Sequence, residues 1–325
     1  MNGNLASIKY LIDNKLTAED LKREVEYLIS NFLVNGSLNM FFAQAGQGKS
    51  FLTISLALTL IKSKKIKQCF YLDADNSLSA LKSRGLDKLI EDNPELIYIH
   101  SSKFSESPNT LLDKLSTDAK KDTNIFEDTL FVFDSIRDFI AGDMNSDRDI
   151  IKVMQQLKDL REAGATVIYL HHTTKDSDGT LYKGSTAFID SVDIAYALSS
   201  KRTDNRLNYQ LTVRKDRLSV ESCAFELNTE TMILESENIQ IAVMSEHEAE
   251  FAKKVQALLT FCGDTGIKQS DLLANVGKSS DDKTARKYLH KFANEMWRVE
   301  KRATENNATY YFSLPNEPNL PLACA

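Results

Sequence analysis

The part of this chain with the clearest chemistry is a glycine-rich segment near residue 45. Residues 39–50 (NMFFAQAGQGKS) run from an apolar stretch into a turn that ends in Gly-Lys-Ser. Backbone N–H groups in such a turn can surround the phosphates of a nucleoside triphosphate, and the N-terminus of a following helix adds about half an elementary positive charge. Lys49 can reach the β- and γ-phosphates, and the Ser50 hydroxyl can bind Mg²⁺. The segment therefore predicts ATP and Mg²⁺ as cofactors.

One position of this segment departs from the usual pattern. Phosphate loops follow G-x-x-x-x-G-K-[ST], but Ala43 stands at the first position. The alternative is a chance Gly-Lys-Ser in a loop, but Met40–Phe42 is typical of a buried strand and Phe51–Ile61 of a buried helix. We expect the cofactor to contact the turn and the start of this helix, namely Ala45, Gly46, Gln47, Gly48, Lys49, Ser50 and Phe51.

A second chemical signal is an acid at the end of an apolar run. Residues 130–134 (LFVFD) are four apolar residues followed by Asp134. A buried strand that ends in a carboxylate places that charge at the carboxyl edge of a sheet, where α/β proteins bind ligands. Asp134 is therefore predicted to hold Mg²⁺ together with Ser50, directly or through water. The alternative, an Asp that caps the next loop, is weakened by the phosphate loop upstream.

Two further acids, Asp73 and Asp75, lie in residues 71–77 (YLDADNS). Their i, i+2 spacing puts both carboxylates on the same side of an extended backbone. One of them could orient and polarise an attacking water. Capping of the helix that follows, or a turn, explains these residue types equally well, so the residues alone leave both interpretations open.

Two adjacent histidines end another apolar run. Neighbouring residues on a strand face opposite ways, so we expect only one of His171 and His172 to reach the nucleotide, as a hydrogen-bond donor to the γ-phosphate. A metal site is not expected, because no third ligand stands at a usual spacing. A structural histidine is the alternative. The polar loop Thr173–Lys183 that follows could be a switch, a polymer contact or a plain surface connection.

A basic cluster, Arg214, Lys215 and Arg217, closes a later strand in an otherwise acidic chain. Guanidinium groups suit the charge of a transferring phosphoryl, and a finger supplied by a neighbouring subunit can increase the rate by roughly 10³–10⁵. Taken alone, the cluster is better explained as a solvated basic turn.

Composition sets the limits of the interpretation. The 325 residues, 42% hydrophobic and 26% charged, suffice for a large α/β domain and a smaller one. Apolar runs long enough to span a membrane and a signal-peptide layout are both missing, and the scattered cysteines show no metal spacing, so we expect a cytoplasmic protein with no membrane partner. The net charge of −6 gives no global attraction to nucleic acid.

Apolar runs alternate with amphipathic segments from residue 38 to about 236, which predicts an α/β fold with a mainly parallel sheet covered on both faces. The expected strands are Met40–Ala43, Cys69–Asp73, Leu96–His100, Thr129–Asp134, Thr166–His171, Ile194–Leu198, Asn208–Arg214 and Cys223–Asn228. The expected helices are Lys49–Lys62, Leu78–Ser83, Asn109–Ser116 and Asp147–Ala163. Around this domain we expect a helical arm or cap (1–37), a linker (237–250), a second unit (251–315) and a flexible tail (316–325).

The second unit has a pattern of its own. Helices are expected over Phe251–Cys262, Ile267–Val276 and Asp281–Met296, followed by strands Trp297–Lys301 and Thr309–Leu314. Three helices and a hairpin make a winged-helix pattern. Lys and Arg outnumber Asp and Glu between residues 278 and 302, which is a weak signal for binding duplex DNA. A protein-contact winged helix is the alternative.

Several of these segments occur together and in order in one known family. Residues about 38–236 resemble the RecA-like ATPases of hexameric replicative helicases, and most closely the RepA plasmid helicase group. The resemblance is carried by AQAGQGKS (43–50), YLDADNS (71–77), LFVFDSIRDF (130–139), VIYLHHTTK (167–175), YKGSTAFIDSVD (182–193) and VRKDR (213–217).

The resemblance implies roles for particular residues. Lys49 and Ser50 would bind phosphate and Mg²⁺, Asp134 would be the acidic Mg²⁺ partner, and His172 would sense the γ-phosphate. Lys215 and Arg217 match the Lys-x-Arg pair that such rings insert into the neighbour's site. The resemblance also implies a homo-oligomer, with a hexamer favoured, that passes single-stranded DNA through its channel, where Lys175 and Lys183 are candidate contacts.

One departure from the family concerns the rate. The family usually has a catalytic Glu where this chain has Asp75, which is one methylene shorter, so hydrolysis is expected to be slow or to need a partner. Two other functions stay open: an ATP-dependent regulator of replication or plasmid maintenance that binds duplex DNA without moving along it, and a small-molecule kinase. The kinase is disfavoured, because the histidine and Lys-Gly-Ser segments have no obvious use there.

Overall fold

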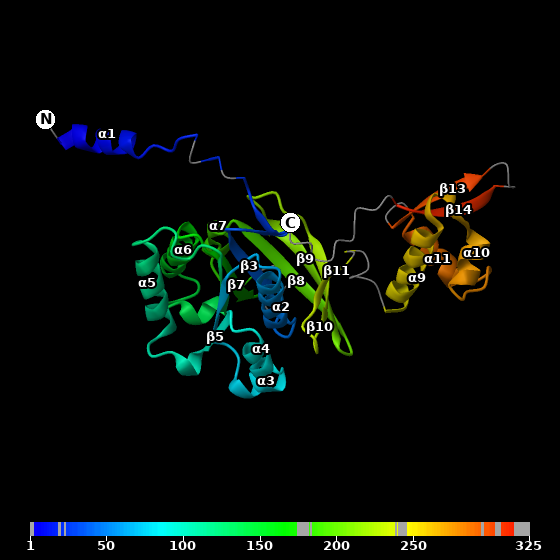
Figure 1. Ribbon diagram of the computed structural model, residues 1–325, viewed down its shortest axis with the longest axis horizontal. Helices are drawn as coiled ribbons and strands as arrows, with labels where there is room; N and C mark the ends of the chain where they lie inside the picture. Colours follow the sequence, from blue (N-terminus) through cyan, green and yellow to red (C-terminus); the bar gives the residue numbers. More distant parts are fainter. Residues whose placement is uncertain are drawn as a thin grey trace.

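The computed structural model describes residues 3–18, 21–22, 24–173, 182, 184–237, 239, 246–293, 296–302 and 307–314 (Figure 1). The helices of the N-terminal 237 residues are α1 (Gly3–Asp13), α2 (Lys49–Lys62), α3 (Leu78–Ser83), α4 (Leu86–Asp92), α5 (Pro108–Ala119), α6 (Asp147–Glu162) and α7 (Ala187–Ser191). The strands are β1 (Tyr27–Ile29), β2 (Leu33–Val34), β3 (Leu38–Ala43), β4 (Gln68–Asp73), β5 (Leu96–His100), β6 (Thr129–Asp134), β7 (Thr166–His172), β8 (Ile194–Thr203), β9 (Arg206–Lys215), β10 (Cys223–Asn228) and β11 (Leu234–Glu237).

A nine-stranded sheet forms the centre of this part, in the order β11-β10-β9-β8-β3-β7-β6-β4-β5. The six strands β8, β3, β7, β6, β4 and β5 run parallel to one another. Strands β9, β10 and β11 each run antiparallel to the strand beside them. Parallel neighbours need crossover connections, and the helices between the strands supply them. The predicted α/β fold with a mainly parallel sheet is therefore confirmed.

The sheet separates two apolar cores, as expected for parallel strands that are buried on both faces. On one face Leu52 and Leu56 of α2 pack with residues of β1 and β2. On the other face Met154 and Leu157 of α6 pack with residues of α5 and α7. The side chains of β3 and β6 are buried along the whole length of each strand.

Strand register decides which strand ends meet. Ala43 at the end of β3 lies opposite His172 at the end of β7. Asp73 at the end of β4 lies opposite Asp134 at the end of β6. Because parallel strands end at the same edge of the sheet, four segments singled out in the sequence converge there.

The prediction of a helical segment over residues 1–37 is correct for α1 but wrong for the residues nearest the domain. Tyr27–Ile29 and Leu33–Val34 form an antiparallel pair of strands. The turn between them contains Asn31 with φ 53°, a left-handed conformation that Asn tolerates better than most residues. Leu28 and Ile29 are buried in the core beside α2, so their helix-like spacing reflects a buried hairpin.

The second unit contains α9 (Glu246–Cys262), β12 (Ile267–Lys268), α10 (Gln269–Asn275), α11 (Lys283–Lys291), β13 (Trp297–Arg302) and β14 (Ala308–Ser313). It has a core of its own, in which the face of α11 predicted to be apolar contributes Ala285, Leu289 and Phe292. The expected helix Ile267–Val276 begins instead as a short strand that pairs with β14. The winged-helix assignment and the domain limits stay predictions, and the tail Pro315–Ala325 lies outside the described residues.

In the described parts of the chain, no helix combines the length and the apolar character that crossing a membrane requires.

Candidate nucleotide-binding site

The glycine-rich loop joins the end of β3 to the start of α2, as the sequence predicted. Gly46 and Gly48 adopt φ 82° and 72°, in the left-handed region that glycine reaches without a steric cost. Gly48 is the N-cap residue of α2, so the loop leads directly into the N-terminus of that helix. A Cβ on Gly48 would lie 2.6 Å from the hydroxyl oxygen of Tyr209, so a larger residue here would force the tyrosine or the loop to shift.

Two residues of the β8–β9 ribbon hold the loop in place. The Tyr209 hydroxyl donates a hydrogen bond to the carbonyl oxygen of Gly48 at 2.8 Å. The backbone N–H of Ser200 donates to Oε1 of Gln47 at 2.6 Å. Sequence reasoning missed both partners, because nothing local marks residues about 150 positions away as contacts of the loop.

The ammonium group of Lys49 lies inside the turn. It donates to the carbonyl oxygens of Ala43 at 3.2 Å and Gln44 at 3.3 Å. Burial lowers the pKa of Lys49, and the carboxylates of Asp134 and Asp75 act in the opposite direction. A cation already held at the start of a helix suits the binding of a polyphosphate.

Asp134 lies beside the first turn of α2. The hydroxyl of Ser50 donates to Oδ2 of Asp134 at 2.6 Å, and the hydroxyl of Tyr71 donates to the same oxygen at 2.8 Å. Only 2% of Asp134 is exposed, and burial raises the pKa of its carboxyl to about 6. This is the reverse of the shift expected for a carboxylate that already has a cationic partner.

Ser50 and Asp134 fit the magnesium ion that the sequence predicted there. Both are oxygen donors, which Mg²⁺ prefers, and Mg²⁺ in phosphate-binding sites commonly takes one or two protein carboxylates besides phosphate oxygens and water. Among the described residues, no cluster of three or more His, Cys, Asp or Glu side chains could hold a metal by itself. When bound, Mg²⁺ would neutralise phosphate charge as it does in other P-loop proteins.

The structure distinguishes the two acids that the sequence left open. Asp73 is fully buried and accepts hydrogen bonds from the backbone N–H groups of Asp75 and Asn76 and from the hydroxyl of Tyr98, at 3.0, 3.0 and 2.6 Å. It therefore fixes the turn after β4. The Asp75 side chain, by contrast, is 49% exposed and has an oxygen 3.8 Å from Nε2 of His172.

The two histidines also separate as expected for neighbours on a strand. His171 is fully buried, with its ring 4.4 Å from that of Phe188. Nδ1 of His172 lies 3.4 Å from the ammonium of Lys49, and its other ring nitrogen faces Asp75. Interaction with the His172 ring lowers the pKa of Asp75, which keeps that carboxylate ionised at neutral pH. Lys49, His172 and Asp75 thus form one connected group at the sheet edge.

Lys215 and Arg217 do not belong to this group. Lys215 pairs with Ala195 near the start of β8, whereas the phosphate loop follows the end of the parallel strand β3. Its ammonium donates to the carbonyl oxygens of Ile189 and Asp190 at 2.7 and 2.8 Å. Arg217 donates to the same Asp190 carbonyl at 3.4 Å. Both cations lie at the opposite edge of the sheet from Lys49 of the same chain.

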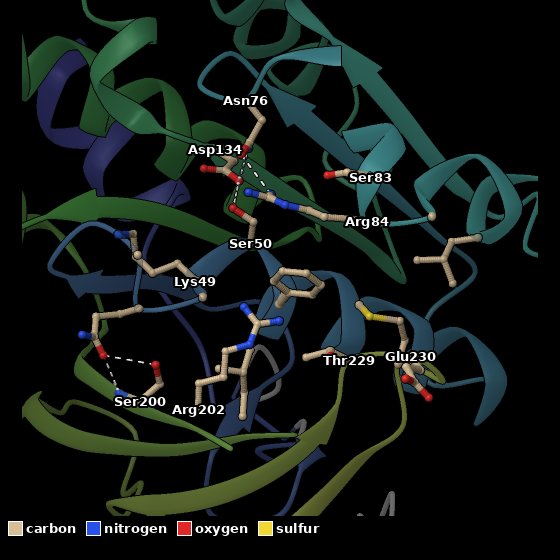
Figure 2. Close-up of a pocket in the computed structure, with 18 of the residues that line it drawn as sticks. Lys49, Ser50, Asn76, Ser83, Arg84, Asp134, Ser200, Arg202, Thr229 and Glu230 are labelled. Carbon is tan, nitrogen blue, oxygen red and sulfur yellow. Dashed lines mark hydrogen bonds between the residues drawn. The ribbon is translucent and has the colours of Figure 1, made fainter. Parts of the chain in front are cut away.

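A cavity of about 1280 Å³ extends from the phosphate loop between α3–α4 and the turn that follows β10 (Figure 2). The predicted loop residues from Ala45 to Phe51 line it, together with Asp75, Asp134 and His172. Arg84 and Arg202 line it as well, and neither was expected. Arg84 donates to Oδ1 of Asn76 at 3.0 Å and lies 5.3 Å from the centre of the Phe51 ring.

A family model described as an AAA domain matches residues 11–178, which is just over half of the chain. The chain belongs to this family. It is a P-loop ATPase domain protein, and the resemblance to RecA-like helicase-type ATPases is confirmed at that level. No curated protein matches the chain.

P-loop ATPase domains generally use ATP and Mg²⁺, which agrees with the cofactors predicted from the loop. The family match does not assign roles to single residues, so the roles of Asp75, His172, Lys215 and Arg217 stay predictions. Lys175 and Lys183, the predicted channel residues, lie outside the described residues.

Proposed function

We propose that this P-loop ATPase is a ring-forming motor that moves on single-stranded DNA and hydrolyses ATP at sites shared between neighbouring subunits. In this proposal Lys49 and Ser50 bind the triphosphate, Asp75 orients the attacking water, and His172 contacts the γ-phosphate. Lys215 and Arg217 of one subunit enter the site of the next.

The observation that supports the proposal most directly is the distribution of the cations. The acidic and phosphate-binding side chains gather at one edge of the sheet, and Lys215 and Arg217 lie at the other. The sheet therefore separates Arg217 from the Lys49 of its own chain. A head-to-tail ring joins two different surfaces of each subunit, so it can bring the cations of one subunit to the phosphate loop of the next.

The arrangement also suggests how hydrolysis would be controlled. Asp75 is ionised and partly exposed, so it can accept a proton or orient a water. In this proposal no guanidinium of the same chain stabilises the negative charge that develops on the γ-phosphate in the transition state. An arginine that does so can increase kcat by roughly 10³–10⁵. Hydrolysis would then depend on assembly, which prevents free subunits from consuming ATP.

The test combines native mass measurement with ATPase kinetics, each with and without a single-stranded oligonucleotide. We expect a ring of identical subunits with ATP and Mg²⁺, and faster hydrolysis when the oligonucleotide is present. Lys49→Ala serves as the control that abolishes turnover. A monomer whose ATPase does not respond to the oligonucleotide would refute the motor.

A second candidate is an ATP-dependent regulator that binds duplex DNA without moving along it. It is favoured by α11, which exposes Lys283, Arg286 and Lys287 on the side away from its apolar face. A helix presented in this way can enter a major groove and contact phosphates. Short Asp75 in place of the family's Glu also suits a switch that hydrolyses slowly.

The two candidates differ in what Lys49→Ala does to DNA binding. The regulator predicts sequence-selective duplex binding that survives this substitution and weakens when Lys283 and Lys287 are replaced by Glu. The motor predicts that binding to single-stranded DNA depends on ATP and is therefore lost in Lys49→Ala. Fluorescence anisotropy with both kinds of DNA at fixed salt distinguishes them, since salt alone changes such affinities strongly.

A further inference from the structure

The nucleotide cavity is lined by an arginine, Arg202, to which neither the motif nor the family match gives a role. Arg202 lies on β8, lines the cavity and is exposed. Within the described part of the chain, its guanidinium has no hydrogen bond or ion pair. Arg84, on the other side of the cavity, is instead held by Asn76.

Strand register fixes the direction in which Arg202 faces. Ser200 lies opposite Tyr209, and Arg202 lies opposite Leu207. Side chains opposite each other in an antiparallel pair stand on the same face of the sheet. Both Tyr209 and Leu207 face Gly48, with atoms 2.6 and 3.2 Å from the position where its Cβ would be. Arg202 must therefore stand on the face that carries the phosphate loop.

Figure 2 agrees with this placement: the Arg202 side chain extends from the strand side of the cavity toward the start of α2, where Lys49 and Ser50 lie. The positive charge of Arg202 also acts on the hydroxyl of Tyr209, which itself contacts the Gly48 carbonyl. Asp134 ends β6 and Asp75 follows the end of β4, and both strands lie on the other side of β3 from β8 in the sheet. Arg202 thus approaches the loop from the side opposite these carboxylates.

We propose that Arg202 binds the α- or β-phosphate of the nucleotide held by its own subunit. This rests on the proposed binding of ATP at the loop and adds a residue that neither the motif nor the family match indicates. The backbone after Gly48 surrounds the α- and β-phosphates in loops of this kind. Lys49, His172 and Asp75, which the proposed function assigns to the γ-phosphate end, lie together on the side of the loop away from the ribbon.

Because of its position, Arg202 should affect nucleotide binding, whereas Arg217 should affect the rate of hydrolysis. A phosphate shared by ATP and ADP is present before, during and after hydrolysis, so its contact contributes equally to ground state and transition state. Loss of Arg202 should weaken nucleotide binding and leave kcat nearly unchanged. Loss of Arg217 should do the reverse.

The test measures the Kd of Mg²⁺-ATP and of ADP, and kcat at saturating ATP, for wild type, Arg202→Gln and Arg202→Lys. We expect Arg202→Gln to raise both Kd values by roughly 10- to 100-fold, the usual worth of a hydrogen bond to a charged group. Arg202→Lys should restore part of the loss, because the charge remains while the planar fork is missing.

Arg206→Gln is the matched control. Arg206 lies on the same ribbon, outside the residues that line the cavity, and pairs with Glu226. It should leave both Kd values unchanged. Equal Kd values for Arg202→Gln and wild type would overturn the proposal, as would a loss confined to ATP or a fall in kcat alone. Failure of wild type itself to bind ATP would instead refute the proposed function.

Discussion

Asp75 and His172 lie 3.8 Å apart beside the ammonium of Lys49, and their geometry limits what each can do. Lys49 can only donate, so in a hydrogen bond between the two side chains Nδ1 of His172 is the acceptor, and Nε2 is the ring nitrogen that faces Asp75. The histidine so placed connects the lysine of the phosphate loop to the acid expected to orient water. Loss of the γ-phosphate would therefore affect Asp75 through the His172 ring.

The first prediction concerns the length of this acid. Asp75→Glu should increase kcat by up to about 100-fold, the factor that misplacing a group by 1 Å can cost. Asp75→Asn should lower kcat by about 100-fold or more, since it removes the base but keeps the size of the side chain. Steady-state ATPase kinetics at saturating ATP measures both. Unchanged kcat in both variants would show that another group orients the water.

Asp134 gives a prediction for stability against pH. Its folded pKa of about 6 exceeds the usual aspartate pKa of 3.8, so the stability linked to its protonation is fully present below pH 3.8 and lost as pH rises through 6. Charging this buried group costs on the order of 3 kcal/mol at about 1.4 kcal/mol per pKa unit. Without nucleotide, Asp134→Asn should therefore unfold at higher urea than wild type at pH 8.

The gain of Asp134→Asn should shrink as the pH falls through 6 toward 3.8, because the folded wild-type carboxyl becomes protonated over that range. Hydrolysis should be lost at every pH. Urea unfolding monitored by circular dichroism at several pH values measures the difference. A stability difference that does not depend on pH would mean that the carboxyl is not desolvated as the structure indicates.

At the scale of elements, the β8–β9 ribbon determines the shape of the phosphate loop. Gln47 and Gly48 are both held by residues of the ribbon, and Gly48 leaves no room for a Cβ against Tyr209. The loop is thus shaped by strands that follow it in sequence by about 150 residues. A movement of the ribbon would move the phosphate-binding backbone with it.

Gly48→Ala tests this dependence against a matched glycine. Gly36 also has a left-handed φ, 66°, but has open space where a Cβ would stand. Each substitution should cost about 1–2 kcal/mol for the left-handed backbone, and Gly48→Ala alone should also raise the Kd for ATP. Titration calorimetry and urea unfolding separate the two effects. Adding Tyr209→Phe to Gly48→Ala should recover part of the affinity, and no recovery would argue against the clash.

At the scale of the whole molecule, strands that end in polar residues were the most predictable features. Cys69–Asp73, Leu96–His100, Thr129–Asp134 and Cys223–Asn228 match the observed strands to within a residue, because each is a buried apolar run with a clear polar end. The loop, Asp134 and the histidines could be placed at one sheet edge for the same reason.

What the sequence could not give depends on contacts between distant residues. The helix-like spacing of Leu28 and Ile29 fits a helix as well as the observed strand, since short apolar runs are ambiguous in period. Asp73 and Asp75 are both aspartates, two positions apart, so the sequence cannot distinguish their roles. The hydrogen bonds that Asp73 accepts from the Tyr98 hydroxyl and from the backbone of the turn show that it stabilises the turn. Arg202 could be assigned to the site only from the cavity it lines and from its register with Leu207.

Mixing two inactive variants tests most directly whether Arg217 of one subunit completes the nucleotide site of another. Lys49→Ala lacks its own phosphate loop lysine but offers Arg217, and Arg217→Ala has the reverse defect. If the finger acts between subunits of a head-to-tail ring, an equal mixture restores turnover at about a quarter of the sites. If each chain is complete by itself, the mixture stays as inactive as its parts, and that result would contradict the account.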